Sequence, residues 1–433
     1  MKRIGRISRL AGLAVVMLLL VACSDDPTDD KPSSDEPTLP ELPTVDVKTV
    51  GGEALTFDYI TAPPGCLGQG ITNAQKVCGR MTITHQGKTL YDSGDYEEDK
   101  RGMRIKVRGN SSAWEPKKSY KIDLEQPVDL LCRNDELKYR DGEWLLVRDW
   151  QASPYMLIGT MVNEMLGLPW TPGFRYVNLM LNGEYMGLYA LVESVKRSTR
   201  SRLNVGRYGY VIELDAYWWN EEVWFETLMT EEPFMKYTFK YPDPEKIKPE
   251  RIAYIRDYIN DFDDGLVNKN RFAEYIDSTS FAAWLLGQDI LGSNDANGTN
   301  IFITKYDDTP ETKLMMGCLW DFDYIMMTPG RWSESHNLSY FVRLLNNGRD
   351  RSFANAYRAK WNEVKDSIYD TIKLRLEAFA ASEEGEAYER AMIRDTQKWG
   401  WRHTALKVLI DQAVTWFEER RVWLDKAVEE ETQ

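Results

Sequence analysis

The hydrophobic periodicity of this chain changes near residue 247, and this change limits the folds that it can adopt. Before that point apolar residues alternate with polar ones, as at every second position of RGMRIKVRG (101–109). After it, segments such as RIAYIRDYINDFDDGL (251–266) repeat their apolar residues with the period of a helix. A β-rich part followed by an α-rich part predicts the α+β fold class.

Turn and helix signals divide the β-rich part further. The segment FRYVNLMLNGEYMGLYALVESV (174–195) predicts two strands joined at Asn182-Gly183, the residue pair most typical of tight hairpins. The segment PYMLIGTMVNEML (154–166) has a helical pattern. We therefore expect a β-rich region over residues 46–195 that contains one helix, and a mainly helical region over residues 196–433. One more strand is expected at GYVIELDAYWW (209–219).

The first 22 residues predict an export signal. Four basic residues precede an apolar run that is too short to cross a membrane as a mature helix. The run ends in Leu-Val-Ala-Cys, which resembles a bacterial lipobox, so we expect residues 1–22 to be a lipoprotein signal peptide and Cys23 to carry the lipid. A plain secretory signal followed by a chance cysteine is the alternative.

Residues 23–45 predict a tether. The stretch 24–45 holds five prolines and seven acids and almost no bulky apolar residues, so it cannot form a core. Its first residues, Ser24-Asp25-Asp26, resemble the acidic export signals of Bacteroidetes surface lipoproteins. We therefore expect an outer-membrane lipoprotein that is exposed on the cell surface and attached to the membrane through Cys23. An acidic linker without an export role is the alternative.

The net charge of the chain indicates which kinds of partner it can bind. The chain has 54 Lys and Arg against 68 Asp and Glu, a formal net charge of -14. An excess of acids argues against a protein that coats nucleic acid, so we expect no nucleic-acid partner. We also expect a monomer.

Histidine and cysteine are scarce. Three histidines, His85, His336 and His403, make a histidine-rich metal site difficult to build. Cysteines at 66, 78, 132 and 318 permit disulfides in an exported protein, and Cys66 and Cys78 flank a Gly-containing turn. The pairing stays open at this stage.

One candidate segment lies between two predicted strands. Arg108 is followed by a glycine and three small polar residues, whose backbone N–H groups can face an anion. Lys121, on the strand that follows, has the phase of Ser119 and Asp123 and supplies a mobile positive charge. The segment therefore suggests a phosphate site, and a tight hairpin with solvated lysines is the alternative.

A second candidate segment is rich in Asn and Asp. Phosphoryl transfer needs a carboxylate near the acceptor hydroxyl and oxygen ligands for Mg²⁺. Asp295 and Asn300 have the spacing of the Asp and Asn in the protein-kinase catalytic loop, and Asp321-Phe322 follows a hydrophobic run as the kinase Asp-Phe does. Asp323 stands where a kinase has glycine. Two acidic surface loops are the alternative reading of the same residues.

Five motifs in order give a resemblance to a known family. They are VRGNSS, PKKSYKI, LNGEYMGLYALVE, NDANGTN and WDFD. This set resembles the spore-coat CotH kinase family over roughly residues 46–428. The resemblance implies a bilobal protein-kinase-like fold, with a β-rich N-lobe (46–195), an α-rich C-lobe (196–433) and ATP in the cleft. It also implies Mg²⁺-dependent transfer of the ATP γ-phosphate to Ser or Thr, here of an exported protein.

The resemblance implies a role for each candidate residue. Asp295 would be the catalytic base, and Lys121 would contact the α- and β-phosphates. Asn300 and Asp321 would bind Mg²⁺, with Asp323 as a further metal carboxylate. The remaining candidates would bind ATP and its phosphates: Arg108, Gly109, Asn110, Ser111, Ser112 and, through its backbone at the crossing between the lobes, Glu193.

The chain departs from the family at the expected partner of Lys121. The motif D-x-S-x-x-R-N is absent after the turn at residue 150, and Glu164 on the following helix is the candidate in its place. Two other functions remain open. A catalytically inactive surface protein could bind a glycan or a protein partner through exposed aromatics at 217, 218, 219 and 224. A glycoside hydrolase would need two carboxylates across a sugar-sized cleft.

Overall fold

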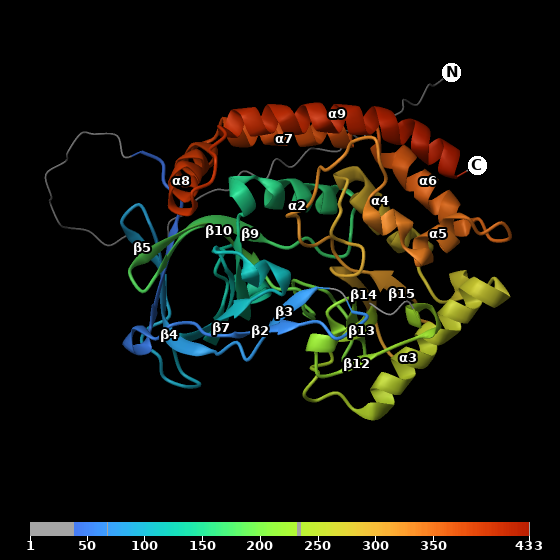
Figure 1. Ribbon diagram of the computed structural model, residues 1–433, viewed down its shortest axis with the longest axis horizontal. Coiled ribbons are helices and arrows are strands. Elements are labelled where there is room, and N and C mark those ends of the chain that lie inside the picture. Colours follow the sequence, from blue (N-terminus) through green and yellow to red (C-terminus); the bar gives the residue numbers. More distant parts are fainter. Residues whose placement is uncertain (1–38, 67, 232–234, 433) are drawn as a thin grey trace, which may run out of the picture. The chain divides into compact units, whose positions relative to one another are not determined.

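The computed structural model describes residues 39–66, 68–231 and 235–432, and the first sheet in it closes into a barrel. Its strands are ordered β1-β9-β10-β8-β7-β6-β4, and β1 pairs with both β9 and β4, which completes a ring (Figure 1). The pairing of β1 with β9 is parallel, and β5 extends the sheet from β4. The bounds are β1 (Thr44–Thr49), β4 (Val77–His85), β5 (Lys88–Asp92), β6 (Met103–Arg108), β7 (Ser119–Val128), β8 (Asp141–Arg148), β9 (Phe174–Leu181) and β10 (Glu184–Glu193).

The alternation of β6 decides which of its residues enter the barrel core. Met103, Ile105 and Val107 are buried, and the basic residues between them are half-buried on the other face. A strand with one apolar face has its register fixed, because a slip by one residue would expose that face. The predicted hairpin is confirmed, since Asn182 and Gly183 join β9 to β10 with positive φ angles of 51° and 83°.

A second sheet lies in the region after residue 196, where the sequence predicted mainly helices and one strand. All of its pairings are antiparallel, in the order β12-β13-β11-β14-β15. The bounds are β11 (Tyr210–Asp215), β12 (Trp224–Phe225), β13 (Lys236–Tyr241), β14 (Ile301–Lys305) and β15 (Leu314–Met316). Every residue of β11 and β14 is buried, so these strands show no alternation in the sequence.

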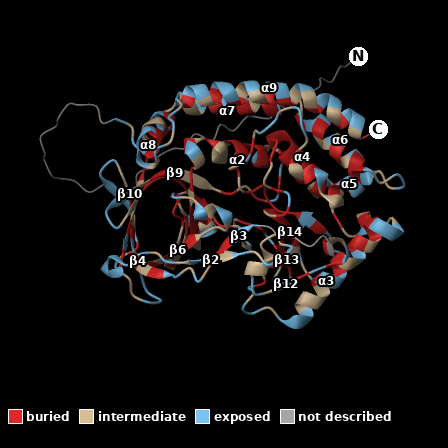
Figure 2. Cartoon of the chain, viewed as in Figure 1, coloured by how far each residue is buried: buried red, intermediate tan, exposed pale blue. Residues whose placement is uncertain are grey.

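Helices complete the fold. The predicted helix over 154–166 is confirmed as α2 (Tyr155–Met165), which packs against α7 (Ile368–Ala380), and α7 in turn packs against α9 (Leu406–Glu431) (Figure 1). α4 (Ser278–Leu291) is buried almost throughout, whereas α9 exposes one side (Figure 2). The other helices are α1 (Glu136–Tyr139), α3 (Pro249–Asp264), α5 (Ser339–Leu345), α6 (Ser352–Val364) and α8 (Glu383–Trp399).

These elements confirm the α+β class. The residues from Pro40 onward form one compact unit that contains both sheets and the helices. The resemblance implied a β-rich N-lobe, and the structure has a closed barrel there, because β1 pairs with β4 and β9 at once. The fold therefore supports a mixed α+β architecture, without the clear two-lobe form of a protein kinase.

The N-terminal predictions lie mostly outside the described residues. The signal peptide, Cys23 and the tether up to residue 38 belong to this part, and β1 begins at Thr44, two residues inside the stretch assigned to the tether. Among the described helices, none is long and apolar enough to cross a membrane. The four cysteines of the described chain are free thiols, including Cys66 and Cys78.

Candidate active site

The two candidate segments meet in one cleft between the barrel and the second sheet. The cleft has a volume of about 760 Å³. The first segment reaches it from the end of β6 and from β7, and the second from the loop before β14 and the loop after β15. The predicted site residues that line the cleft are Arg108, Gly109, Asn110, Ser111, Ser112, Lys121, Asp295, Asn300, Asp321 and Asp323.

The loop after β6 has a backbone that only glycine fits at its first position. Gly109 has φ of 105°, and a Cβ there would lie 2.3 Å from the Ser112 Oγ atom. The loop then enters the short helix η2 (Ser111–Trp114). Asn220 donates to the Ile71 carbonyl at 2.7 Å and to the Asn110 amide oxygen at 3.4 Å. The loop is therefore held from the second sheet as well as from the barrel.

The three lysines of the PKKSYKI motif have different partners. Lys117 is fully buried and pairs with Asp395 of α8 at 2.8 Å, and the Lys118 ammonium donates to nearby backbone carbonyls. Lys121 alone among them lines the cleft. Its ammonium lies 3.1 Å from Glu143 on the neighbouring strand β8 and 3.6 Å from Asp123. Lys121 is thus the lysine of this motif that a ligand in the cleft can reach.

The prediction that Glu164 is the partner of Lys121 is wrong. Glu164 lies on the exposed side of α2, with 54% of its side chain exposed, and pairs with Arg375 of α7 at 2.7 Å. The barrel places Glu143 beside Lys121 because β7 and β8 are adjacent antiparallel strands. The pair therefore forms across two strands, and a helix glutamate is not part of it.

Three carboxylates crowd the end of the cleft that holds the second segment. Burial and the negative charge of Asp321 together raise the pKa of Asp295 to about 7. Burial and Asp321 likewise raise the pKa of Asp323 to about 8. Burial raises the pKa of Asp321 too, although Arg108 and Arg148 oppose the shift. Acids with mutually raised pKa values mark a place where a bound cation would relieve repulsion.

The donors of this group fit a hard cation such as Mg²⁺. Carboxylate and amide oxygens are its preferred protein ligands, and Asn300 adds an amide to Asp321 and Asp323. Within the described residues, no group of three or more His, Cys, Asp or Glu side chains has the geometry of a complete metal site. Mg²⁺ commonly keeps waters and phosphate oxygens as ligands, so one or two carboxylates with an amide are sufficient.

Two of these residues have a strained backbone. Asn300 and Asp321 have φ angles of 63° and 60°, in the left-handed region that residues other than glycine seldom occupy. Such conformations persist where the surroundings enforce them, and they concentrate at functional sites. For Asn300 one enforcing contact is visible, because its backbone N–H donates to the Glu213 carboxylate at 2.9 Å.

Two arginines face the carboxylates. Arg148, only 5% exposed, lies 3.6 Å from Asp323 and stacks over the Trp150 ring, and its buried Nε–H has no hydrogen-bond partner in the described structure. Burial lowers the pKa of Arg108, while Asp321 and Glu213 raise it. A buried guanidinium with an unused donor, next to a loop of small polar residues, suits a phosphate oxygen.

The sequence reasoning missed several residues of this cleft. Glu213 and Asp215 reach it from β11 and Lys240 from β13, in the sheet that was not predicted. Arg148 and Glu143 come from β8, which was not singled out. The sequence offers one signal for Arg148, a basic residue that closes the apolar run Leu145-Leu146-Val147.

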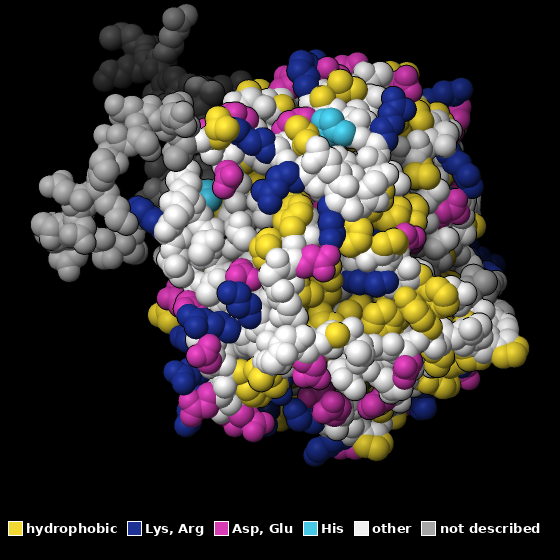
Figure 3. Space-filling view, turned by 60° about the vertical axis from the view of Figure 1, so that its left-hand side comes forward, with side chains coloured by type: hydrophobic (Ala, Val, Ile, Leu, Met, Phe, Trp, Pro, Cys, Tyr) yellow, Lys and Arg dark blue, Asp and Glu magenta, His cyan; other side chains and the backbone are white. Residues whose placement is uncertain are grey.

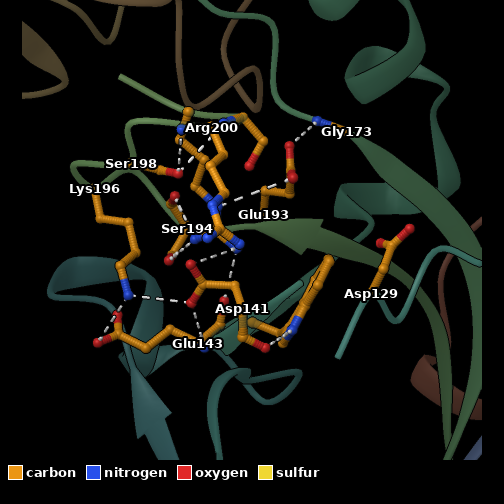
Figure 4. A network of polar contacts seen from close by, with 12 residues as sticks. Asp129, Asp141, Glu143, Gly173, Glu193, Ser194, Lys196, Ser198 and Arg200 are labelled. Carbon is orange, nitrogen blue, oxygen red and sulfur yellow. Dashed lines mark hydrogen bonds and ion pairs between the residues drawn. The ribbon is translucent and has the colours of Figure 1, made fainter. Parts of the chain in front are cut away.

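Glu193 does not line the cleft, which corrects its assignment as an adenine contact. It is buried at the end of β10, where its carboxylate accepts from Arg133 and from the Gly173 N–H at 2.9 Å each. Its own N–H donates to the Gly173 carbonyl at 3.0 Å. The next residues reach the cleft instead, including Lys196, which donates to Asp141 at 3.1 Å beside Glu143 (Figure 4).

The aromatic cluster considered for ligand stacking is half-buried at residues 217–219, and Trp224 is 39% exposed. The ammonium of Lys236 lies 4.0 Å from the Trp218 ring centre and 3.9 Å from that of Trp224. Trp219 packs on the β2–β3 hairpin (Asp58–Thr61 and Gln69–Thr72), close to Gly70. Tyr217 lines the cleft. The cluster therefore fastens the hairpin and the second sheet together, and it is not a free platform of four rings.

A cleft with a glycine-containing anion loop, basic residues and crowded carboxylates defines a kinase-like phosphotransferase site. The family model "CotH kinase protein" matches residues 105–424, which is more than half of the chain. The chain therefore belongs to the CotH kinase family, and the match includes every predicted residue that lines the cleft. No curated protein shows a significant match to the chain.

Proposed function

We propose that the protein transfers the γ-phosphate of ATP to a Ser or Thr hydroxyl of an exported protein, in a reaction that requires Mg²⁺. The observation that carries the proposal is the convergence of Lys121, Asn300 and Asp321 on one cleft, although they lie far apart in the sequence. The barrel and the second sheet would form the two walls around the nucleotide. The cleft volume of about 760 Å³ is large enough for one nucleotide.

The residues of the cleft would have different roles in phosphoryl transfer. Lys121, Arg108 and Arg148 would bind phosphate oxygens, and the backbone N–H groups of residues 109–112 would face the same anion. A Mg²⁺ ion held by Asn300, Asp321 and Asp323 would neutralise charge on the phosphates. These contacts orient the terminal phosphate and exclude water from it, and they need no covalent intermediate on the protein.

Asp295 would act on the acceptor. The acceptor oxygen forms a bond to the γ-phosphorus while the bond from that phosphorus to the β–γ bridging oxygen breaks, and ADP leaves. The proton of the acceptor hydroxyl passes to the Asp295 carboxylate. Burial raises the pKa of the Asp295 carboxyl above its ordinary value, which makes it a stronger general base. In the described structure Asp295 accepts no hydrogen bond, which leaves its oxygens available for the acceptor.

The test is phosphate incorporation from labelled ATP into a mixture of exported proteins, with and without Mg²⁺. We expect transfer to Ser and Thr that requires the metal and is lost in Asp295→Ala. Circular dichroism and thermal unfolding of the variant establish that it is folded. A folded wild-type protein that neither binds Mg²⁺ with ATP nor transfers phosphate would overturn the proposal.

We also propose that the protein is a lipoprotein on the outer face of the outer membrane, attached through Cys23. The lipobox-like sequence and the acidic stretch after it support this location. On the face shown in Figure 3, acidic and basic side chains are interspersed. A Cys23→Ser variant should appear in the soluble fraction without labelled fatty acid. A variant that stays in the membrane with its label would refute the anchor.

A further inference from the structure

Glu213 lies in the floor of the cleft and contacts two neighbours at once. It is 6% exposed and points from β11 toward the residue that precedes β14. One carboxylate oxygen accepts the backbone N–H of Asn300 at 2.9 Å. The other lies 2.9 Å from the ammonium of Lys240 on β13. Three strands of the second sheet therefore meet at this side chain.

The contact with Asn300 falls where the backbone is strained. Asn300 is only 8% exposed and has φ of 63°, so its N–H needs an acceptor inside the protein. From Ile301 onward the chain is fixed by the pairing of β14 with β11. At Asn300 itself the described structure shows the Glu213 carboxylate as the acceptor of the N–H. This contact therefore determines the local conformation from which the Asn300 side chain leaves the backbone.

The ion pair with Lys240 keeps the carboxylate in place. Glu213 can rotate away from Asn300 only if its other oxygen leaves the Lys240 ammonium. The nearby acid Asp215 does not compete for this role, because it accepts from the N–H of Tyr217 at 2.7 Å and from the hydroxyl of Thr238 at 3.2 Å. Glu213 is thus anchored on one side and acts on Asn300 with the other.

The side-chain amide of Asn300 is left available by this arrangement. No hydrogen bond to it from the described residues is present, although the residue lines the cleft. A residue whose backbone is fixed and whose amide is unused is suited to hold a ligand with a defined direction.

We propose that Glu213 is a positioning residue that directs the amide oxygen of Asn300 toward the Mg²⁺–nucleotide complex. This inference rests on the proposed function and extends it to a residue outside the motifs of the sequence. Removal of a residue that orients a metal ligand typically weakens metal binding by roughly 10- to 100-fold.

The experiment measures Mg²⁺ binding in the presence of ATP by titration calorimetry, together with the Mg²⁺ concentration that gives half-maximal transfer. Glu213→Ala should raise that concentration about 10-fold, as Asn300→Ala should. Glu213→Gln keeps an oxygen acceptor for the N–H and should give a smaller rise, of about two- to threefold. The double variant should be no weaker than Asn300→Ala alone, because both changes act through one ligand.

The control is Glu226→Gln. Glu226 follows β12 in the same sheet and pairs with Lys236 at 3.0 Å, but it does not line the cleft. Its Mg²⁺ dependence should match the wild type. If Glu213→Ala does not fold, Lys240→Met tests the same proposal, because it releases the carboxylate and should also raise the half-maximal Mg²⁺ concentration.

The outcomes separate the two proposals. Wild-type protein without Mg²⁺–ATP binding overturns the proposed function and this inference with it. Binding that is weakened by Asn300→Ala and unchanged by Glu213→Ala and Lys240→Met overturns this inference alone. Additive losses in the double variant also overturn it, because they would show that Glu213 acts on the ligand by another route.

Discussion

The buried acid Asp289 and the buried acids of the cleft differ in how far neighbouring residues compensate their charge. Asp289, at the end of α4, accepts hydrogen bonds from the Ser333 N–H and hydroxyl, from His336 and from the Tyr357 hydroxyl. Although burial raises the pKa of Asp289, His336 and the hydroxyl donors lower it below the usual value. The protein itself neutralises this acid.

The charges of the cleft acids are compensated less completely than that of Asp289. Asp295, six residues further along the chain, has burial and the charge of Asp321 as its surroundings, and its pKa rises to about 7. Asp323 has the Arg148 guanidinium at 3.6 Å and a pKa of about 8. The difference indicates that Asp289 serves the fold, while the cleft acids are arranged for a charge that the ligand brings.

The largest expected effect comes from Asp321→Asn. The change removes the proposed metal carboxylate and keeps the left-handed backbone, which asparagine tolerates. We expect phosphate transfer to fall at least about 100-fold. Thermal unfolding should occur at the same temperature as in the wild type or higher, because repulsion with Asp295 is relieved. Loss of activity together with a large loss of stability would place Asp321 with Asp289, among the structural acids.

For Asp289→Asn we expect a loss of stability, in contrast to Asp321→Asn. This variant removes the closer of the two carboxylates beside the buried His336, and breaking a buried pair typically lowers the free energy of unfolding by about 3–5 kcal/mol. Urea unfolding measures the change. Asp295→Asn is the matched control, since it is also a buried acid and should not destabilise the protein. If Asp289→Asn and Asp295→Asn are equally stable, Asp289 is no more important for the fold than the cleft acids are.

A smaller effect concerns pH. Burial lowers the pKa of His336, but Asp289 and, less strongly, Glu431 raise the value to about 9, above the ordinary 6.5. The pair therefore stabilises the fold fully below about pH 6.5, and this contribution is lost as the pH rises through about 9. We expect about 3 kcal/mol less stability at pH 9.5 than at pH 6.5 from this shift. Urea unfolding of the wild type and of His336→Gln at both pH values isolates this contribution. If the two proteins lose the same stability between these pH values, the prediction is wrong.

The sequence predicted what local patterns control. The alternation of β6, the turn at Asn182-Gly183 and the helix α2 each depend on residues that are neighbours in the chain. Of the second sheet the sequence predicted only the strand β11, and β14 was missed because it is buried on both faces and lacks alternation. Barrel closure was missed because β1 pairs in parallel with β9, far along the chain.

The same division holds for the candidate site. Gly109 and Asp321 stand in motifs, so the sequence could single them out. Arg148 and Glu213 act through partners in loops far along the chain, and a single sequence does not show which residues form such pairs. The prediction for Glu193 came from its place at the end of a predicted strand. The residues just after it line the cleft, while Glu193 itself stays buried.

The smallest expected effects distinguish Glu143 from Glu164 as the ion-pair partner of Lys121. Glu164→Gln removes a mostly exposed pair with Arg375, so stability should change by less than about 1 kcal/mol and transfer should be unaffected. Glu143→Gln removes the partner of Lys121 at 3.1 Å and should raise the KM for ATP about two- to fivefold, since the lysine loses its fixed position. Steady-state kinetics with varied ATP measure both variants. A KM that rises in Glu164→Gln and not in Glu143→Gln would mean that α2 moves to Lys121 when nucleotide binds, because only such a movement brings that carboxylate to the cleft.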